Sequence, residues 1–149
     1  MVNKQKRKGT AFENQAVKLL NDLIVGAEFK RVPGSGAIGT IVNEPMLTGD
    51  IKGKIEHFPQ PLKGECKSGY SNKSGGEAKS FSLKKEWLDK IKMEAANMYA
   101  FPIFLGHFDN ARSGVKTFVC LDIEDFAMLI NSYTDLQRDM IEMEERGNQ

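Results

Sequence analysis

The residues GDIKGKIEHFPQPLKGECK, at positions 49–67, contain two strand-like runs with a turn between them. The first run covers 50–58 and the second covers 62–67. The intervening Pro59-Gln60-Pro61 favours a hairpin, because prolines interrupt strands and begin turns. This stretch therefore predicts two antiparallel neighbours in a sheet.

The second of these strands carries two charged side chains on one face. Side chains alternate along a strand, so Glu65 and Lys67 project to the same side, while Gly64 and Cys66 face a core. Asp50 begins the partner strand and lies within reach of Glu65. Two neighbouring carboxylates repel each other unless a cation lies between them, and oxygen ligands suit Mg²⁺, with Mn²⁺ as a substitute.

This arrangement suits the hydrolysis of a phosphodiester. A metal ion screens the phosphate, and a lysine beside it can orient or deprotonate a water and stabilise charge in the transition state. The spacing alone leaves an alternative open, in which Asp50, Glu65 and Lys67 lie on a solvated hairpin face and pair by chance.

The apolar pattern of the remaining chain alternates between helical and strand-like spacing. It predicts a helix that opens at Gly9-Thr10, a second helix from 83 to about 99 with Ser82 as its N-cap, and a helical tail from Asp122. Strands are expected at 29–32, 102–108 and 117–121, and loops at 37–48 and 68–80. The order indicates a single α/β domain over 1–149, with a central mixed sheet flanked by helices.

Charge is distributed unevenly along the chain. Residues 1–92 hold 17 Lys and Arg against 10 Asp and Glu, whereas residues 93–149 hold 4 against 10. A basic arm over 1–9 and an acidic helical tail over 122–149 lie at the two ends. The basic excess favours a polyanion as partner, although segregation on a solvated surface is the alternative. Charge alone suggests nucleic acid without indicating a reaction.

Other features concern the cellular compartment. No apolar run approaches the length of a membrane span, which excludes a membrane protein of the helical type. Cys66 and Cys120 are the only cysteines and form no CxxC pair, which suits a reducing cytoplasm. We therefore expect an intracellular, DNA-associated protein.

The hairpin residues match the PD-(D/E)XK nuclease pattern, and further blocks narrow the resemblance. These blocks are residues 7–13, 17–20, 31–37 and 82–86, in that order, on either side of the hairpin. Together with the hairpin they resemble the archaeal-type Holliday junction resolvases.

The resemblance implies a restriction-endonuclease-like fold and a metal held by Asp50, Glu65 and the backbone carbonyl of Cys66. Lys67 would then position or activate the attacking water, and Glu13 would be a helix carboxylate near the metal. The implied DNA contacts, with those expected from basic and mobile segments, are Lys6, Arg7, Lys8, Arg31, Ser35, Tyr70 and Lys73. Asn14 departs from the arginine that usually follows the helix glutamate in this family.

Glu13 has a second interpretation. Thr10-Ala11-Phe12-Glu13 fits a capping box, in which Glu13 bonds back to the amide of Thr10. Yet Glu13 is also in line with Val17 and Leu20 on an apolar stripe. It therefore faces the core of the protein, which a capping role does not require.

The leading functional hypothesis is a homodimeric, Mg²⁺-dependent endonuclease that cuts four-way DNA junctions with paired symmetric nicks in recombination or repair. The alternatives are another PD-(D/E)XK endonuclease of the structure-specific, restriction or repair type, and a DNA-binding module without catalysis. The intact Asp50, Glu65 and Lys67 argue against the last of these.

Overall fold

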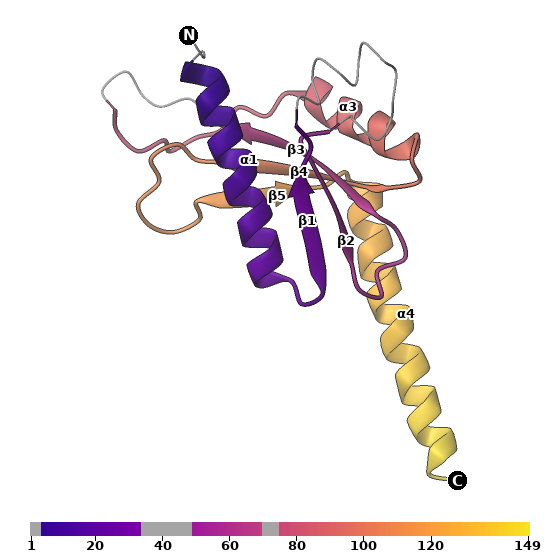
Figure 1. The fold of residues 1–149 in the computed structure, drawn as a ribbon. Coiled ribbons are helices and arrows are strands. Elements are labelled where there is room, and N and C mark those ends of the chain that lie inside the picture. Colours follow the sequence, from indigo (N-terminus) through magenta and orange to yellow (C-terminus); the bar gives the residue numbers. More distant parts are fainter. Residues whose placement is uncertain (1–3, 34–48, 70–74) are drawn as a thin grey trace.

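The computed structural model describes residues 4–33, 49–69 and 75–149, with side chains from Arg7 onward. Three helices and five strands make up this part of the chain (Figure 1). In chain order they are α1 (Lys4–Leu23), β1 (Ala27–Arg31), β2 (Ile51–Ile55), β3 (Leu62–Ser68), α3 (Lys85–Ala96), β4 (Phe101–His107), β5 (Thr117–Cys120) and α4 (Ile123–Gly147).

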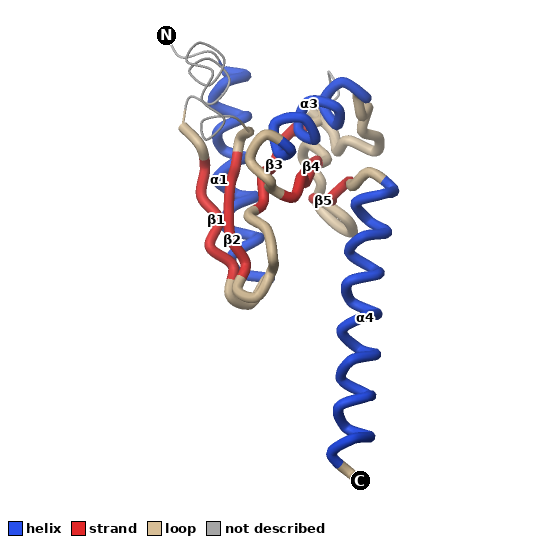
Figure 2. The backbone as a smooth tube through the Cα atoms, turned by 90° about the vertical axis from the view of Figure 1, so that its right-hand side faces the viewer, coloured by secondary structure: helices blue, strands red, loops and turns tan. Residues whose placement is uncertain are grey.

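The five strands form one sheet in the order β1-β2-β3-β4-β5. Only the β3–β4 pair is parallel among these neighbours, so the sheet is mixed. Helix α1 packs on β1 and β3, and α3 packs on β3 and β4. Figures 1 and 2 show the two helices on either side of the sheet. The fold predicted from the sequence, an α/β domain of the restriction-endonuclease-like type, is confirmed.

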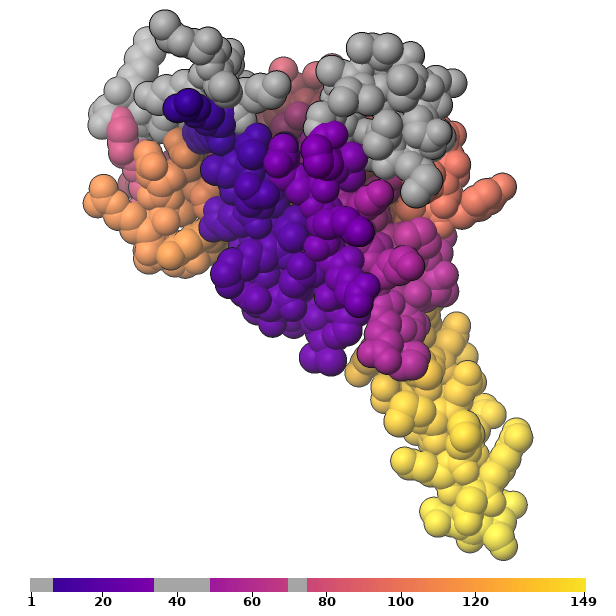
Figure 3. Space-filling model, viewed as in Figure 1, coloured from indigo at the N-terminus to yellow at the C-terminus, as the bar shows by residue number. Residues whose placement is uncertain are grey.

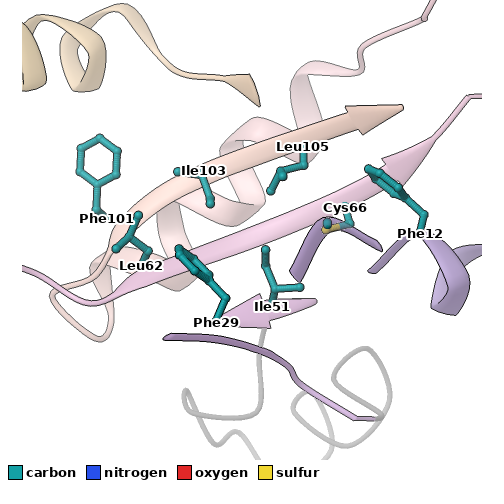
Figure 4. Close-up of a cluster of buried hydrophobic side chains, with 9 residues drawn as sticks. Phe12, Phe29, Ile51, Leu62, Cys66, Phe101, Ile103 and Leu105 are labelled. Carbon is teal, nitrogen blue, oxygen red and sulfur yellow. The ribbon is translucent and has the colours of Figure 1, made fainter. Parts of the chain in front are cut away.

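The core beneath α1 is built around the predicted hairpin (Figure 4). Gly64 is required there, because a Cβ at this position would lie 2.5 Å from Cγ1 of Ile51. The buried side chains are Phe12, Ala16, Phe29, Ile51, Leu62, Cys66, Phe101, Ile103 and Leu105. Both faces of β3 are covered, so Glu65 on the other face is also buried, at 1% exposure.

The opposite face of the sheet packs through aromatic rings. Trp87 of α3 stacks on Phe104 of β4, with ring centroids 6.1 Å apart and planes 7° apart. Phe81 contacts both rings and also meets Phe108 and Phe118 edge-on. Trp87 is therefore part of the packing that holds α3 on the sheet.

Two helix starts were predicted wrongly. Helix α1 begins at Lys4, not at Gly9-Thr10, so most of the expected basic arm is helical. Lysine, glutamine and arginine favour helix, which offsets the cost of Gly9 within it. Ser82 is not an N-cap, because α3 begins at Lys85 after Lys84, which makes no side-chain cap bond. The preceding residues are irregular instead, since Phe81 is packed among the aromatic rings.

Smaller differences concern element ends. Strand β1 begins at Ala27, two residues earlier than predicted, and β2 ends at Ile55 where residues 50–58 were expected. Helix α3 ends at Ala96, before the predicted end near Tyr99. The predicted mobile loop at 68–80 is anchored in its described last part, because the buried Ala78 donates its amide to the Asp109 carbonyl at 2.9 Å.

Helix α4 begins where the sequence predicted the tail. The Asp122 side chain caps it by accepting the Glu124 amide at 2.8 Å. From there the helix leads away from the sheet into solvent, as Figure 3 shows, and none of its residues is buried. Among the residues that the structure describes, α4 included, no helix is long and apolar enough to cross a bilayer.

Candidate active site

Asp50 stands at the point where the chain enters β2. Gly49 before it adopts a φ of +75°, a left-handed conformation that glycine takes without strain. The Asp50 amide then donates to the Gly64 carbonyl at 2.8 Å, and its side-chain Oδ2 accepts the Cys66 amide at 2.8 Å. Two hydrogen bonds to β3 thus fix both the backbone and the carboxylate of Asp50.

Glu65 and Lys67 lie on the same face of β3, as the alternation predicted. Lys67 Nζ lies 2.8 Å from Glu65 Oε1. The other oxygen, Oε2, is buried and accepts no hydrogen bond from the described residues. Lys90 of α3 places its Nζ 3.5 Å from this oxygen. A buried carboxylate oxygen without a hydrogen bond is costly, which makes it a candidate ligand for a cation.

The environment raises the pKa of Asp50 to about 6. Burial of the carboxyl is the largest cause, and the negative charges of Glu65 and Glu13 act in the same direction. The hydrogen bond from the Cys66 amide and the charge of Lys67 oppose the shift. Burial, together with the neighbouring charges of Glu65 and Glu13, therefore disfavours the charged form of Asp50 in the metal-free protein.

The pKa of Lys67 is raised as well, which in a base favours the charged form. Burial alone would lower its pKa, but the hydrogen bond to Glu65 and the charges of Glu65 and Asp50 outweigh it and raise the pKa. Its ammonium also lies over the Trp87 ring, 5.4 Å from the centroid. Lys67 is thus held as a cation beside the two carboxylates, and only their neutralisation would make it a better base.

Glu13 is not a helix cap. Thr10 lies inside α1, so the capping box has no helix start to serve. Glu13 instead forms a short, part-buried ion pair with Nε of Arg31 on β1. Its charge also acts on Asp50. The structure therefore brings Glu13, Asp50, Glu65 and Lys67 into one electrostatic cluster where β2 begins and β3 ends.

The predicted DNA contacts do not all gather there. Arg7 is exposed, but Lys8 is engaged by the Asp109 carboxylate at 2.9 Å and the Gly69 carbonyl at 3.0 Å. Arg31 is held by Glu13. Ser35, Tyr70, Lys73 and the side chain of Lys6 lie outside the described residues, as does the 37–48 loop.

A row of lysines on the sheet was not recognised from the sequence. Lys30, Lys52 and Lys63 are directly opposite one another on β1, β2 and β3, and Lys54 follows on β2. The four line a cavity of about 460 Å³ beside Met98 and Ala100. Lys63 is buried and under the charge of Glu94, and Glu28 lies opposite Lys54. Lys30 and Lys52 remain as like charges directly opposite each other, a pairing that destabilises a sheet and favours an anionic partner.

The alternation in the sequence could have revealed these lysines. Lys52 and Lys54 flank Gly53, whose missing side chain makes room for Phe29 on the opposite face. Lys52 lies two residues after Asp50, and Lys63 lies two residues before Glu65. Each lysine is therefore about 7 Å along the strand from a carboxylate of the site. The lysine row therefore begins next to Asp50 and Glu65.

The chemistry of the donors fits a hard divalent cation. Asp50 and Glu65 supply carboxylate oxygens, and the Cys66 carbonyl is a third oxygen on the same strand. The Cys66 thiol is unsuited as a ligand, because burial and the charge of Asp50 raise its pKa. No cluster of three or more His, Cys, Asp or Glu side chains able to hold a metal occurs in the described parts of the chain. A metal here would thus need backbone, water or substrate oxygens beside the two carboxylates.

A mixed sheet that carries an aspartate at one strand and Glu-x-Lys on the next is the arrangement of the PD-(D/E)XK nucleases. Comparison with known families agrees. The model of the family described as "Phage putative PDDEXK endonuclease" matches residues 4–149, and the chain belongs to this family. The match supports the PD-(D/E)XK superfamily but does not extend to the archaeal-type Holliday junction resolvases. No curated protein and no solved structure matched the chain.

Proposed function

We propose that this protein is a Mg²⁺-dependent DNA endonuclease whose active site consists of Asp50, Glu65, Lys67 and Glu13. The observation that carries the proposal is the buried Oε2 of Glu65, which accepts no hydrogen bond from the described residues although Lys90 Nζ lies 3.5 Å away, close to a second carboxylate with a raised pKa. A metal ion between the two carboxylates would satisfy this oxygen and relieve their repulsion, and the superfamily typically uses divalent metals. Asp50, Glu65 and the Cys66 carbonyl would hold the ion, with Glu13 as a further candidate.

A bound divalent ion would supply positive charge to the scissile phosphate and make a nearby water more acidic. The other residues of the site would position the attacking water and stabilise charge on the phosphate. Trp87 and Glu65 fix Lys67, so its ammonium can orient the attacking water or stabilise charge on the phosphate. Glu13 adds negative charge and is itself positioned by Arg31.

The lysine row provides a track for the DNA backbone. Lys30 and Lys54 are exposed and Lys52 is half-buried, so all three can reach phosphates. Their contribution would be independent of sequence, because phosphate contacts carry no base information. A DNA substrate also follows from membership of a nuclease family.

The preferred substrate in this proposal is a four-way junction, cut by two symmetric nicks. One active site per chain cannot reach both strands, so the proposal requires a homodimer. Another PD-(D/E)XK endonuclease, of the structure-specific, restriction or repair type, fits the family about as well. A binding module without catalysis fits less well, because it would not need the intact Asp50, Glu65 and Lys67.

A cleavage assay with Mg²⁺ distinguishes these functions. Labelled junction, duplex, flap and single-stranded DNA are offered at equal concentration and moderate salt. Paired nicks near the branch point, with junction cut faster than duplex, support the resolvase. Equal cutting of duplex and junction favours the general endonuclease, and binding without cutting in Mg²⁺ or Mn²⁺ rejects the enzyme.

A further inference from the structure

Helix α4 exposes large apolar side chains along most of its length. Tyr133 is 63% exposed, Leu136 57% and Met143 72%, although all three lie on a regular helix far from the chain's own core. Figure 2 shows that the helix leaves the sheet after its first turns. An exposed stripe of this size on an isolated helix marks an interaction surface.

The spacing of the stripe specifies the kind of partner. Its members follow one another at intervals of three and four residues, which is the heptad repeat of a two-stranded coiled coil. They are Phe126, Leu129, Tyr133, Leu136, Met140 and Met143. Leu129, the member next to the sheet, is partly buried against the domain core, so the free part of the stripe starts where α4 leaves the body.

We infer that α4 pairs with α4 of a second copy of this chain, in antiparallel orientation. In that register Phe126 meets Met143 of the partner subunit, and Tyr133 meets Leu136 of the partner subunit. Each aromatic ring then packs on a flexible or aliphatic side chain, and methionine sulfur contacts rings favourably. In the same register Met140 of the partner subunit lies at the level of Leu129, whose side chain is already partly covered by its own domain.

Charges flanking the stripe select this orientation. A parallel pair would place Asp139 beside Glu144 of the partner subunit, twice by symmetry, and would gain no attractive pair. The antiparallel pair places Arg146 beside Asp125 of the partner subunit and creates no like-charge contact. Asp125 already lies 3.3 Å from Lys92 of its own chain, at the base of the helix. The antiparallel pair also keeps the two domains at opposite ends.

The oligomeric state tests this pairing without reference to cleavage. Sedimentation of the full chain should give twice the mass of 16.7 kDa. Leu136→Glu places a charge in the centre of the stripe and should give the monomer mass with an unchanged sheet signal in circular dichroism. Asn131→Glu adds the same charge on the opposite side of the helix and should leave the dimer intact. A monomer mass for the parent chain overturns the inference and leaves the stripe to another protein.

Disulfide trapping tests the orientation. Chains carrying Cys120→Ser with Phe126→Cys are mixed with chains carrying Cys120→Ser with Met143→Cys, since the native Cys66 is buried. Mild oxidation should link the two kinds of chain to each other. Homodimers linked through position 126 alone or position 143 alone indicate a parallel pair and overturn the antiparallel register.

Discussion

The backbone amide of Cys66 donates to Oδ2 of Asp50 at 2.8 Å, so one residue of β3 holds a carboxylate that belongs to β2. This bond points the carboxylate at the neighbourhood of Glu65 without the help of a metal. The repulsion between the two acids is therefore present in the metal-free protein, and several predictions depend on it.

Neutralising either carboxylate should separate binding from cutting. Asp50→Asn or Glu65→Gln should reduce Mg²⁺-dependent cleavage by at least about 100-fold, because even residues that only support a metal ligand cost 10–100-fold. DNA binding in Ca²⁺ should stay within a few-fold of the parent, since the lysine row is untouched. Gel shift and single-turnover cleavage measure the two effects. Near-normal cleavage by either variant would mean that the ligands are assigned wrongly.

The pH dependence of stability should reveal Asp50. Its pKa is raised from 3.8 to about 6, so the folded chain holds a proton that the unfolded chain has released in this range. Stability of the metal-free protein should therefore fall as pH rises from about 4 to 6, by on the order of 2 kcal/mol from this group. Asp50→Asn should lack this component. Urea titrations of both proteins without metal measure the difference, and identical pH profiles would contradict it.

Mg²⁺ should act in the same pH range. Because the metal displaces the Asp50 proton, its affinity should rise with pH up to about 6 and then level off. Titration calorimetry at several pH values, with proton release followed through buffers of different ionisation enthalpy, measures this. A pH-independent affinity would argue that Asp50 is not a ligand.

Substitutions of Glu13 and of its partner Arg31 distinguish a catalytic role of Glu13 from a structural one. Glu13→Gln removes the charge that acts on Asp50 and weakens the ion pair with Arg31. We expect cleavage to fall at least tenfold, while the melting temperature changes by only a few degrees, as for the loss of about 1 kcal/mol. Arg31→Gln is the matched variant, since it breaks the same pair but leaves the carboxylate in place. If both variants keep full activity, the pair serves the fold alone.

The lysine row should set the salt dependence of DNA binding. Replacing Lys30, Lys52 or Lys54 by serine should lower the slope of log affinity against log salt by about 1 for each residue. Lys18→Ser is the control, because Lys18 is paired with Asp22 on the solvent side of α1. Equal effects of the control and the row variants would place the DNA elsewhere.

A glycine in the hairpin tests the packing that holds the site. Gly64→Ala would bring a Cβ within 2.5 Å of Ile51 Cγ1 in the core, and overpacking of this kind costs about 1–3 kcal/mol. Gly147→Ala has open space around it and should leave stability unchanged. Chemical denaturation compares the two variants, and a neutral Gly64→Ala would contradict the described register of β2 and β3.

The hairpin was predictable because its signals are local. Side-chain alternation placed Glu65 and Lys67 on one face, and Asp50, predicted to begin the partner strand, lies immediately before β2 with its amide bonded to the Gly64 carbonyl. Long-range contacts were not predictable in this way. Lys8 resembled a DNA contact, yet Asp109, which is 101 residues later in the chain, engages it.

Helix starts failed for a related reason. Thr10 and Ser82 both belong to residue types that favour the N-cap position, but neither caps a helix in the structure. Favourable helix formers extend α1 backward past Thr10, and the packing of Phe81 keeps Ser82 outside α3. The lysine row shows the same limit, because a row across three strands becomes visible only when the strand register is known.

The parallel pairing of β3 with β4 also determines at what stage of protein synthesis the active site can form. The Asp50–Glu65 hairpin leaves the ribosome first, but β3 lacks its second neighbour until α3 and Phe101–His107 have followed. The loop between two strands that are distant in sequence closes at an entropic cost, so this pairing forms late. Until then Glu65 stays open to water, because Phe104 and Trp87 are not yet stacked beside it. A nascent chain therefore carries both carboxylates without the dry environment that raises the pKa of Asp50, and nuclease competence should arise only after Phe101–His107 has been synthesised.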